Sequence, residues 1–289
     1  MRTLIFGGTG MLGRAVVAEA RRRGSAALAL SHAQADVTDG ERVRYWAETF
    51  RPELVVNCAA YTKVDDCETN EAHATAVNGD AVGHLARAAA AVGARLVQVS
   101  TDYVFDGRAE APYPEDAPTA PLSAYGCSKL AGERAALDGD GAERNLVVRT
   151  SWLFGPGGWS FVEAIVRQIE GGKRELRVVA DQTGCPTYTP YLARAICDLA
   201  AAGAAGTVHY RNREPTTWHG FAREIAHLVD CAVEVVPVTT ADFPRPAPRP
   251  AFSVLDVHRY ERTVGRRVEP WGLGLVEVLA HLQRKSRRA

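Results

Sequence analysis

Short apolar runs alternate with longer helical stretches through the first 150 residues of this 289-residue chain. Apolar runs broken by helices indicate parallel βαβ units, and their near-continuous hydrophobicity indicates strands that are buried on both faces. We therefore expect a doubly wound α/β domain with a parallel, Rossmann-type sheet. Its strands are expected at 2–6, 27–30, 53–57, 94–100 and 145–150, and its helices at 10–23, 41–50 and 71–92.

The pattern loosens after Ser151, which predicts a smaller, loop-rich lobe over 151–289 with some segments returning to the first domain, 1–150. Prolines in "FPRPAPRPAFSVLD" (243–256) exclude regular structure there. The remaining pattern predicts strands near 176–179 and 206–210 and helices at 159–171, 190–202, 216–230 and 272–286.

Charge and composition exclude several classes of protein. Lys plus Arg equals Asp plus Glu, 34 each, so no global field favours nucleic acid or an anionic membrane. The basic end "QRKSRRA" is expected to be a solvated helix end. No apolar run approaches the roughly 20 residues of a membrane span. The six cysteines form no C-x-x-C and none pairs with His at zinc spacing, so we expect reduced thiols, no metal and a cytoplasmic location.

The stretch "IFGGTGMLG" places Gly7, Gly10 and Gly13 after the first strand and at the mouth of a helix. Glycines allow the chain to turn tightly and its backbone to approach a pyrophosphate, which the helix N-terminus then attracts. A tight strand–helix turn alone would also explain the triplet. Its place at the opening of a βαβ unit favours dinucleotide binding.

The end of the second strand bears on the choice of cofactor. An acid there usually binds the ribose hydroxyls of NAD, but this chain has Ser31 and His32. NADPH is therefore permitted, with NADH as the alternative. Asp36 and Val37, in "ADVTD", are expected to flank the adenine, although an ordinary loop aspartate is an equal reading of Asp36.

The stretch "SAYGCSKLAGER" (123–134) places Tyr125 and Lys129 one helical turn apart, on one face. A nearby ammonium and an oxidised nicotinamide would lower the pKa of the tyrosine and favour phenolate. Ser100, Thr101 and Asp102 end the preceding strand, where parallel strands face the ligand crevice. The sequence thus contains a glycine turn for a dinucleotide, then hydroxyl residues at the end of a strand, then the pattern Y-x-x-x-K. This order predicts a reductase with Tyr125 as proton donor.

These residues resemble those of the extended short-chain dehydrogenase/reductases, and among them the dTDP-4-dehydrorhamnose reductase family. The likeness runs nearly end to end and in the family's order. It comprises "NCAAYTKVDDCE", "STDYVFDG", "APLSAYGCSKLAGE", "VVRTSWLFG", "DQTGCPT", "TTWHGFA" and "RPAFSVLD".

The resemblance implies NAD(P)H-dependent reduction of the 4-keto group of a dTDP-4-keto-6-deoxy sugar. It implies a catalytic triad of Thr101, Tyr125 and Lys129. Asp102 and Trp152 would contact the sugar and Arg249 the diphosphate, although Trp152 is equally explained as a packing residue of the cleft. The cofactor would contact Gly10, Met11 and Leu12 at the pyrophosphate, Asp36 and Val37 at the adenosine, and Ala59, Ala60 and Tyr61 in the middle.

Departures from the family pattern limit what carries over. Some members bind magnesium at a dimer contact through glutamates, where this chain has "GRAVV" and "PYLARAICDL". We therefore expect no such metal and a monomer or weak homodimer. Phe252 replaces a frequent polar residue and indicates a different sugar. The alternatives are a ketoreductase for another nucleotide deoxysugar, an epimerase with bound NAD, and a regulatory subunit resembling the methionine adenosyltransferase β subunit.

Overall fold

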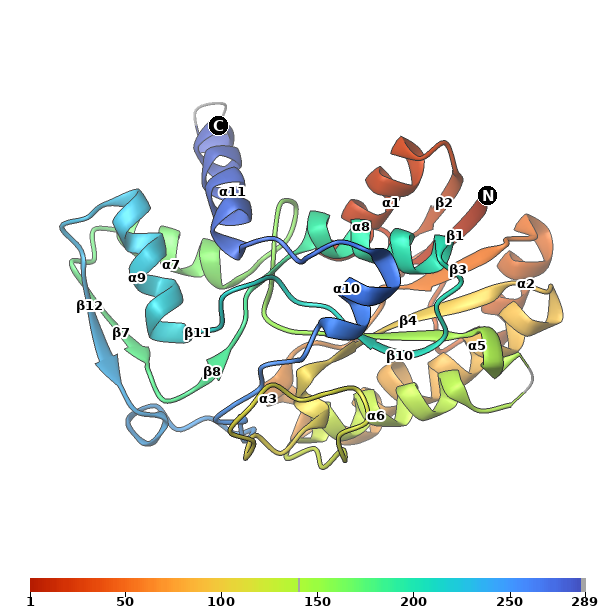
Figure 1. Ribbon diagram of the computed structural model, residues 1–289, viewed down its shortest axis with the longest axis horizontal. Coiled ribbons are helices and arrows are strands. Elements are labelled where there is room, and N and C mark those ends of the chain that lie inside the picture. The colour runs from red at the N-terminus through yellow and green to blue at the C-terminus, as the bar shows by residue number, and fades with distance from the viewer. Residues whose placement is uncertain (140, 287–289) are drawn as a thin grey trace.

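The computed structural model describes residues 1–139 and 141–286, so the last three residues of the basic tail lie outside the described residues (Figure 1). Its centre is a six-stranded parallel sheet in the order β10-β5-β4-β3-β1-β2. The predicted doubly wound α/β fold is confirmed. The strands are β1 (Arg2–Phe6), β2 (Ala26–Leu30), β3 (Leu54–Asn57), β4 (Arg95–Thr101), β5 (Leu146–Thr150) and β10 (Gly206–His209).

Helices cover both faces of this sheet, because successive side chains of each buried strand point to opposite sides. Ile5 packs into one core with α1 (Met11–Arg22) and α8 (Thr189–Ala201), while Leu4 and Phe6 pack into a second core on the other face. The second core is covered by α2 (Gly40–Phe50), α5 (Ala81–Ala91) and α6 (Ala124–Leu137) (Figure 1).

The predicted helix 71–92 is interrupted. It consists of α4 (Glu71–Thr75), a π-helical turn η1 (Ala76–Asp80) and then α5. Within the wide turn Asn78 is 1% exposed and donates hydrogen bonds to the Tyr61 carbonyl (3.0 Å) and to Ser128 Oγ (3.1 Å). The turn therefore carries a polar side chain into the interior between α6 and the loop after β3, which the alanine-rich sequence does not indicate.

The second lobe has its own apolar core. A parallel pair of strands, β7 (Glu175–Val179) and β12 (Glu234–Val238), packs with α7 (Phe161–Glu170), α9 (Trp218–Val229) and α11 (Trp271–Ser286). Ser160 and Glu163 form a capping box at the start of α7, so this helix begins two residues later than predicted. Short strands complete the lobe: β6 (Leu153–Phe154) with β9 (Thr187–Tyr188), and β8 (Thr183–Gly184) with β11 (Thr216–Thr217).

The chain crosses between the lobes several times. After β6 to β9 it returns to form α8 and β10, and after β12 it returns again through α10 (His258–Val264) before ending in α11. The remaining single turns are α3 (Val64–Cys67), η2 (Asp102–Val104), η3 (Ala142–Arg144) and η4 (Thr240–Asp242). Among the described residues, no helix is both long and apolar enough to cross a membrane.

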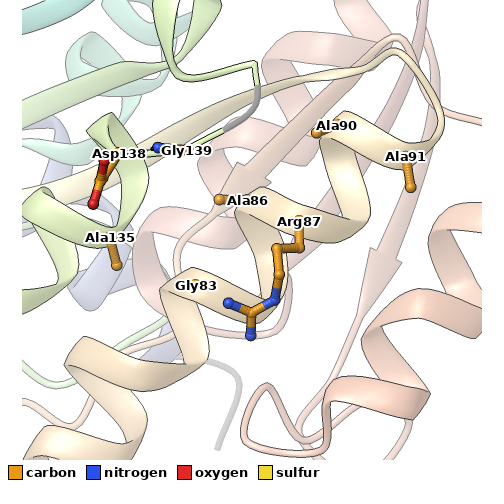
Figure 2. A pocket seen from close by; sticks show the side chains of 8 residues that line it. All are labelled: Gly83, Ala86, Arg87, Ala90, Ala91, Ala135, Asp138 and Gly139. Carbon is orange, nitrogen blue, oxygen red and sulfur yellow. Dashed lines mark hydrogen bonds between the residues drawn. The ribbon is translucent and has the colours of Figure 1, made fainter.

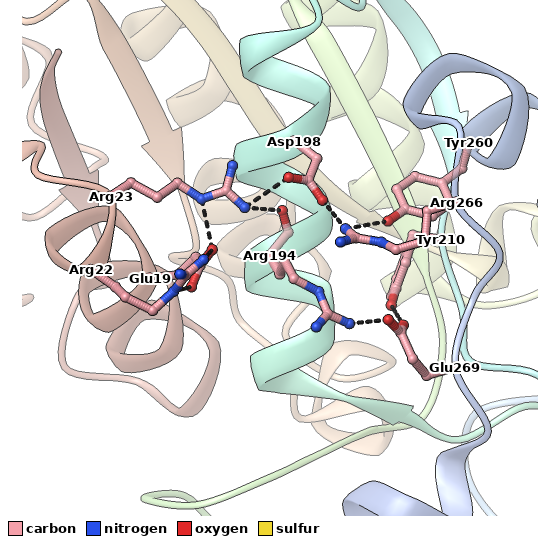
Figure 3. A network of polar contacts seen from close by, with 9 residues as sticks. All are labelled: Glu19, Arg22, Arg23, Arg194, Asp198, Tyr210, Tyr260, Arg266 and Glu269. Carbon is pink, nitrogen blue, oxygen red and sulfur yellow. Dashed lines mark hydrogen bonds and ion pairs between the residues drawn. The ribbon is translucent and has the colours of Figure 1, made fainter.

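A network of charged side chains ties α1, α8 and the segment around α10 together (Figure 3). Asp198 on α8 accepts from Arg23, the residue that follows α1 (2.7 Å), and from Arg266, and Arg194 pairs with Glu269. We call these residues, with Glu19, Arg22, Tyr210 and Tyr260, the α1–α8 network.

Candidate active site

A cavity of about 400 Å³ opens between the lobes at the carboxyl ends of β3, β4 and β5. Parallel α/β sheets place ligands at this edge. The cavity brings together nine of the residues predicted for the site. They are Met11, Leu12, Ala59, Ala60, Thr101, Asp102, Tyr125, Lys129 and Trp152.

Tyr125 and Lys129 are held by the first turns of α6. The helix begins because Ser123 Oγ accepts from the Gly126 amide (3.2 Å), and Gly126 packs so closely that an added β-carbon would lie 2.3 Å from the Tyr103 carbonyl oxygen. Lys129 is 3% exposed, and its Nζ donates to the Val99 carbonyl at 2.6 Å. The tyrosine and the lysine therefore point to the end of β4, where Thr101 lies.

The environment of Tyr125 differs from the one expected from sequence. Burial of the hydroxyl, and then the carboxylate of Asp102, raise the pKa of Tyr125, while a hydrogen bond with Thr101 opposes this rise. The Lys129 ammonium is turned to the Val99 carbonyl, and the pKa of Tyr125 is raised with the lysine in this position. The lowering expected from Lys129 together with an oxidised nicotinamide stays a prediction. Tyr125 is therefore protonated at neutral pH, as a proton donor must be.

Two further ionisable groups in the cavity have shifted pKa values. Burial lowers the pKa of Lys129 to about 8 and raises that of Asp102 to about 6. Asp102 is 2% exposed; its Oδ1 accepts from Thr101 Oγ1 at 3.0 Å, and its Oδ2 has no hydrogen-bond partner among the described residues. An unpaired carboxylate oxygen beside Thr101 is suited to accept a hydrogen bond from a hydroxyl group of a substrate.

A buried ion pair lies next to Lys129 on α6, and the sequence reasoning missed it. Glu133, one turn after Lys129, accepts two hydrogen bonds from Arg149 of β5 (2.9 and 2.7 Å) and one from Ser100 Oγ (2.5 Å). Glu133 and Arg149 are 3% and 5% exposed. These bonds fix α6 against β4 and β5. A carboxylate eight residues after Tyr125 on the same helix face was the available signal.

The turn after β1 fits a dinucleotide. Gly7 has φ +69°, and added β-carbons at Gly7 and Gly13 would lie 2.6 Å from the Ala59 nitrogen and 2.1 Å from the Gly7 oxygen. At Gly10, in contrast, the nearest atom to an added β-carbon is the Gly7 oxygen at 3.3 Å. No side chain caps α1 and its first turn has no acid, so its N-terminus is suited to an anion such as a pyrophosphate.

The corner at the end of β2 is polar and self-paired. Ser31 Oγ donates to Gln34 Oε1 (2.8 Å), and Asp36 Oδ1 accepts from the Thr38 amide (3.0 Å). The hydrogen bonds from the Thr38 amide and from the Thr38 hydroxyl lower the pKa of Asp36. Val37 is buried in the sheet core, so only its backbone is placed to meet an adenine. Ser31 thus leaves the ribose position without an acid of its own.

The loop after β3 is fixed by amides. Asn57 Oδ1 accepts from the Ala59 nitrogen (3.0 Å), and Asn78 Oδ1 accepts from the Tyr61 nitrogen (2.8 Å). Ala59 and Ala60 line the cavity, whereas the Tyr61 ring packs on His73 at 4.8 Å. The π-helical turn therefore serves the site by holding residues 59–61 against the cavity.

The substrate side of the cavity is aromatic. Trp152 has φ +46° and stacks on Trp218, with ring centroids 3.6 Å apart, and an added β-carbon at Gly184 would lie 2.5 Å from its ring. Trp152 thus both lines the cavity and packs the cleft. Backbone strain at a bulky residue recurs at functional sites. Phe252 packs near Tyr113. It lines neither this cavity nor the adjacent cavity that contains Arg249.

Arg249 lies in a neighbouring cavity of about 550 Å³ that shares Tyr103, Phe161 and Trp218 with the first. Its Nη1 donates to Asp65 Oδ1 at 2.5 Å, and this bond lowers the pKa of Asp65. Arg177 and Arg245 also line this cavity. Three guanidinium groups and one carboxylate, that of Asp65, line this cavity, so its lining carries an excess of positive charge.

A larger groove, of about 660 Å³, lies between α5 and α6 (Figure 2). Its lining is small and largely apolar, with Arg87 and Asp138 as its charged side chains, and it contains none of the predicted site residues. Among the described residues, no group of three or more His, Cys, Asp or Glu is arranged to bind a metal ion. The interlobe cavity is therefore the candidate active site.

The glycine turn, the strand-end threonine and the Tyr–Lys helix on this sheet define an extended short-chain dehydrogenase/reductase. A family model described as the RmlD substrate binding domain matches residues 1–284, and the chain belongs to that family. The family resemblance predicted from the motifs is confirmed.

Relatives and solved structures agree with this assignment. The chain is 44% identical to dTDP-4-dehydrorhamnose reductase of Streptomyces griseus, over 96% of this chain and 92% of the relative. It is also 44% identical to a probable dTDP-4,6-dihydroxy-2-methyloxan-3-one 4-ketoreductase of Streptomyces antibioticus, over 96% and 94%. A dTDP-4-dehydrorhamnose reductase structure from Bacillus anthracis, in complex with NADP, superimposes with a TM-score of 0.91 at 33% identity, covering 97% and 99% of the two chains.

Proposed function

We propose that this protein is an NAD(P)H-dependent oxidoreductase that reduces the 4-keto group of dTDP-4-dehydrorhamnose to give dTDP-L-rhamnose. The observation that carries the proposal is the convergence of Thr101, Tyr125 and Lys129 in one cavity. Near-full-length identity of 44% to a dTDP-4-dehydrorhamnose reductase supports the choice of sugar. The alternative of a non-catalytic regulatory subunit is less favoured, because the cavity contains a complete set of groups for proton transfer.

The cofactor would be held along the turn after β1, with Gly7, Gly10, Met11, Leu12 and Gly13 at the pyrophosphate. Ser31, Asp36 and Val37 would meet the adenosine, and Ala59, Ala60 and Tyr61 would lie beside its middle. When bound, NAD(P)H supplies a hydride to the carbonyl carbon. Because no acid of β2 opposes a 2′-phosphate at Ser31, we expect NADPH to be used at least as well as NADH.

Tyr125 would donate its proton to the carbonyl oxygen as negative charge develops there. Burial keeps the phenol protonated until that charge appears. Thr101 would donate a hydrogen bond to the same oxygen in place of its present bond to Asp102. Lys129 would turn from the Val99 carbonyl to the cofactor ribose and stabilise the phenolate that remains.

The sugar would lie against Trp152 and Asp102, with the nucleotide extending into the neighbouring cavity. There Arg249, with Arg177 and Arg245 beside it, would bind the diphosphate in competition with Asp65. We further propose a cytoplasmic enzyme, supported by six free cysteines, and a monomer or weak homodimer.

A second candidate is a ketoreductase for another dTDP-deoxysugar. Equal identity to the Streptomyces antibioticus ketoreductase supports it. Both candidates use the same groups and differ only in the sugar that the aromatic wall accepts.

The test supplies enzymatically made dTDP-4-dehydro-L-rhamnose with NADPH or NADH and follows oxidation at 340 nm, roughly the nicotinamide absorption maximum. NMR of the product then gives the configuration at C4. One NADPH consumed for each dTDP-L-rhamnose formed supports the proposal, and Tyr125→Phe is the matched inactive control. Binding of the keto sugar without NADPH oxidation would favour the regulatory reading, and turnover of a different dTDP-keto sugar alone would favour the second candidate.

A further inference from the structure

Trp159 is a large aromatic side chain at the mouth of the active-site cavity. It lines the cavity together with Tyr125 and Trp152, yet 62% of its surface is exposed. It is the most exposed of the large apolar side chains in the described residues. An indole left in water at the edge of a ligand cavity retains apolar area that a ligand can cover.

The backbone on both sides of Trp159 is fixed. On one side an added β-carbon at Gly158 would lie 2.5 Å from Met11 Cβ, so the loop rests on the turn after β1. On the other side Ser160 caps α7 and exchanges hydrogen bonds with Glu163. The indole is thus anchored between the cofactor turn and the substrate lobe, and its orientation is not an accident of a loose loop.

The side chain is now held by Arg167, one of the exposed residues of α7, whose guanidinium lies 4.5 Å from the indole centroid. At an exposed site such a contact is weak. A ligand that offers the indole an apolar surface therefore meets little competition. The indole is available to the cavity.

The rest of the cavity wall indicates which part of a ligand this would be. Trp152 and Trp218 are stacked, and Phe161 leans on Trp218 with centroids 4.7 Å apart. Trp159 lines the same cavity, and Gly158 next to it packs on Met11. The charged groups suited to a diphosphate lie in the neighbouring cavity, which Trp159 does not line. The part of a nucleotide sugar left at Trp159 is the sugar itself.

We propose that Trp159 packs against the apolar face of the sugar and is a determinant of sugar binding at this site. This inference rests on the proposed function. Trp159 takes no part in proton transfer, so its contribution is to the binding of the sugar and not to the chemical step.

The experiment compares Trp159→Ala, Trp159→Phe and the wild type, each loaded with NADPH, in calorimetric titrations with dTDP and with dTDP-L-rhamnose. We expect Trp159→Ala to weaken the binding of dTDP-L-rhamnose by about ten- to a hundredfold, which is typical for the removal of one buried aromatic side chain. Affinity for dTDP and for NADPH should stay within about twofold, and Trp159→Phe should restore most of the sugar affinity. In turnover, KM for the keto sugar should rise by the same factor, with kcat changed little.

Leu273→Ala is the matched control, because Leu273 is also exposed (56%) but lies on α11, outside both cavities. Equal losses for dTDP and for dTDP-L-rhamnose, or a loss confined to NADPH, would overturn the assignment of Trp159. So would unchanged sugar affinity in Trp159→Ala. Wild-type protein that binds neither dTDP nor its sugar would instead refute the proposed function, which separates the two failures.

Discussion

The active-site cavity and the α1–α8 network both gather charged side chains, but they treat charge in opposite ways. In the cavity, Lys129 and Asp102 are nearly inaccessible to water, and one oxygen of Asp102 has no hydrogen-bond partner in the part of the chain that the structure describes. In the network, each carboxylate meets at least one guanidinium; Asp198 meets two, and its side chain is 17% exposed (Figure 3). Charges are paired where they hold the fold, and left desolvated where they are kept for chemistry.

The difference predicts that substitutions in the cavity cost activity but not stability, and that substitutions in the network do the reverse. Within the cavity, we thus expect substitutions that lower activity to leave the free energy of unfolding unchanged or to raise it.

The largest effect should come from Tyr125→Phe. Phenylalanine keeps the packing but removes the proton, and general acid catalysis is worth about 10²–10⁴-fold, so kcat should fall by that order. NADPH affinity, followed by fluorescence, should barely change. Near-wild-type turnover would mean that the tyrosine is only part of a helix face.

Asp102→Asn should raise stability. Because burial raises the pKa of Asp102 from 3.8 to about 6, the folded state binds its proton more tightly than the unfolded state does. The contribution of Asp102 to stability is therefore present at low pH and is lost as pH rises through about 6. At pH 7.5 the variant should gain up to about 3 kcal/mol in free energy of unfolding, and near pH 4 the gain should vanish. Urea unfolding at both pH values tests this, and a pH-independent difference would contradict it.

Lys129→Met should weaken NADPH by about tenfold or more, since it removes a charged hydrogen-bond donor to the ribose. Burial lowers the pKa of Lys129 to about 8, so its charge destabilises the folded state below that pH. In the wild type this penalty is relieved as pH rises from about 8 to 10.5. The variant should thus be more stable than the wild type at pH 7 and lose this advantage above pH 10. Unaltered NADPH binding would show that Lys129 does not reach the cofactor.

Asp198→Asn tests the other region. It leaves Arg23 and Arg266 with a neutral partner, and a partly exposed network of this kind is worth about 1 kcal/mol. We expect a small loss in urea unfolding and unchanged kcat and KM. A drop in kcat would show that the two regions are coupled.

The smallest effect is expected from chelation. The family's magnesium positions lack their glutamates, so EDTA should leave both turnover and thermal unfolding unchanged. Loss of activity that magnesium restores would reveal a site formed in another way.

The nucleotide-binding half was more predictable than the substrate lobe, for a physical reason. Leu4, Ile5 and Phe6 belong to a strand buried on both faces, and such runs stand out in sequence. Strand pairs of only two residues, such as β6 with β9, are fixed by tertiary contacts and have no periodicity. The π-helical turn was hidden because alanines fit any helix, and the buried Asn78 within it has no periodic signal in the sequence.

Within the site, local spacing predicted that Tyr125 and Lys129 share a helix face, but not where their charges go. The hydrogen bond from Lys129 to the Val99 carbonyl and the burial that raises the pKa of Tyr125 depend on how α6 sits on β4. Contacts between distant segments, such as Glu133 with Arg149 or Trp152 with Trp218, are likewise properties of the packed fold.

The repeated crossing of the chain between lobes has a consequence for how the protein is made. A nascent chain that ends at Thr150 lacks both β10, the edge strand of the sheet, and α8, which covers one of its faces with α1. Residues such as Val97 and Val148, which α8 buries in the finished molecule, would then face solvent during synthesis. We therefore expect that the amino-terminal half does not fold on its own, and that the two lobes melt in a single cooperative transition.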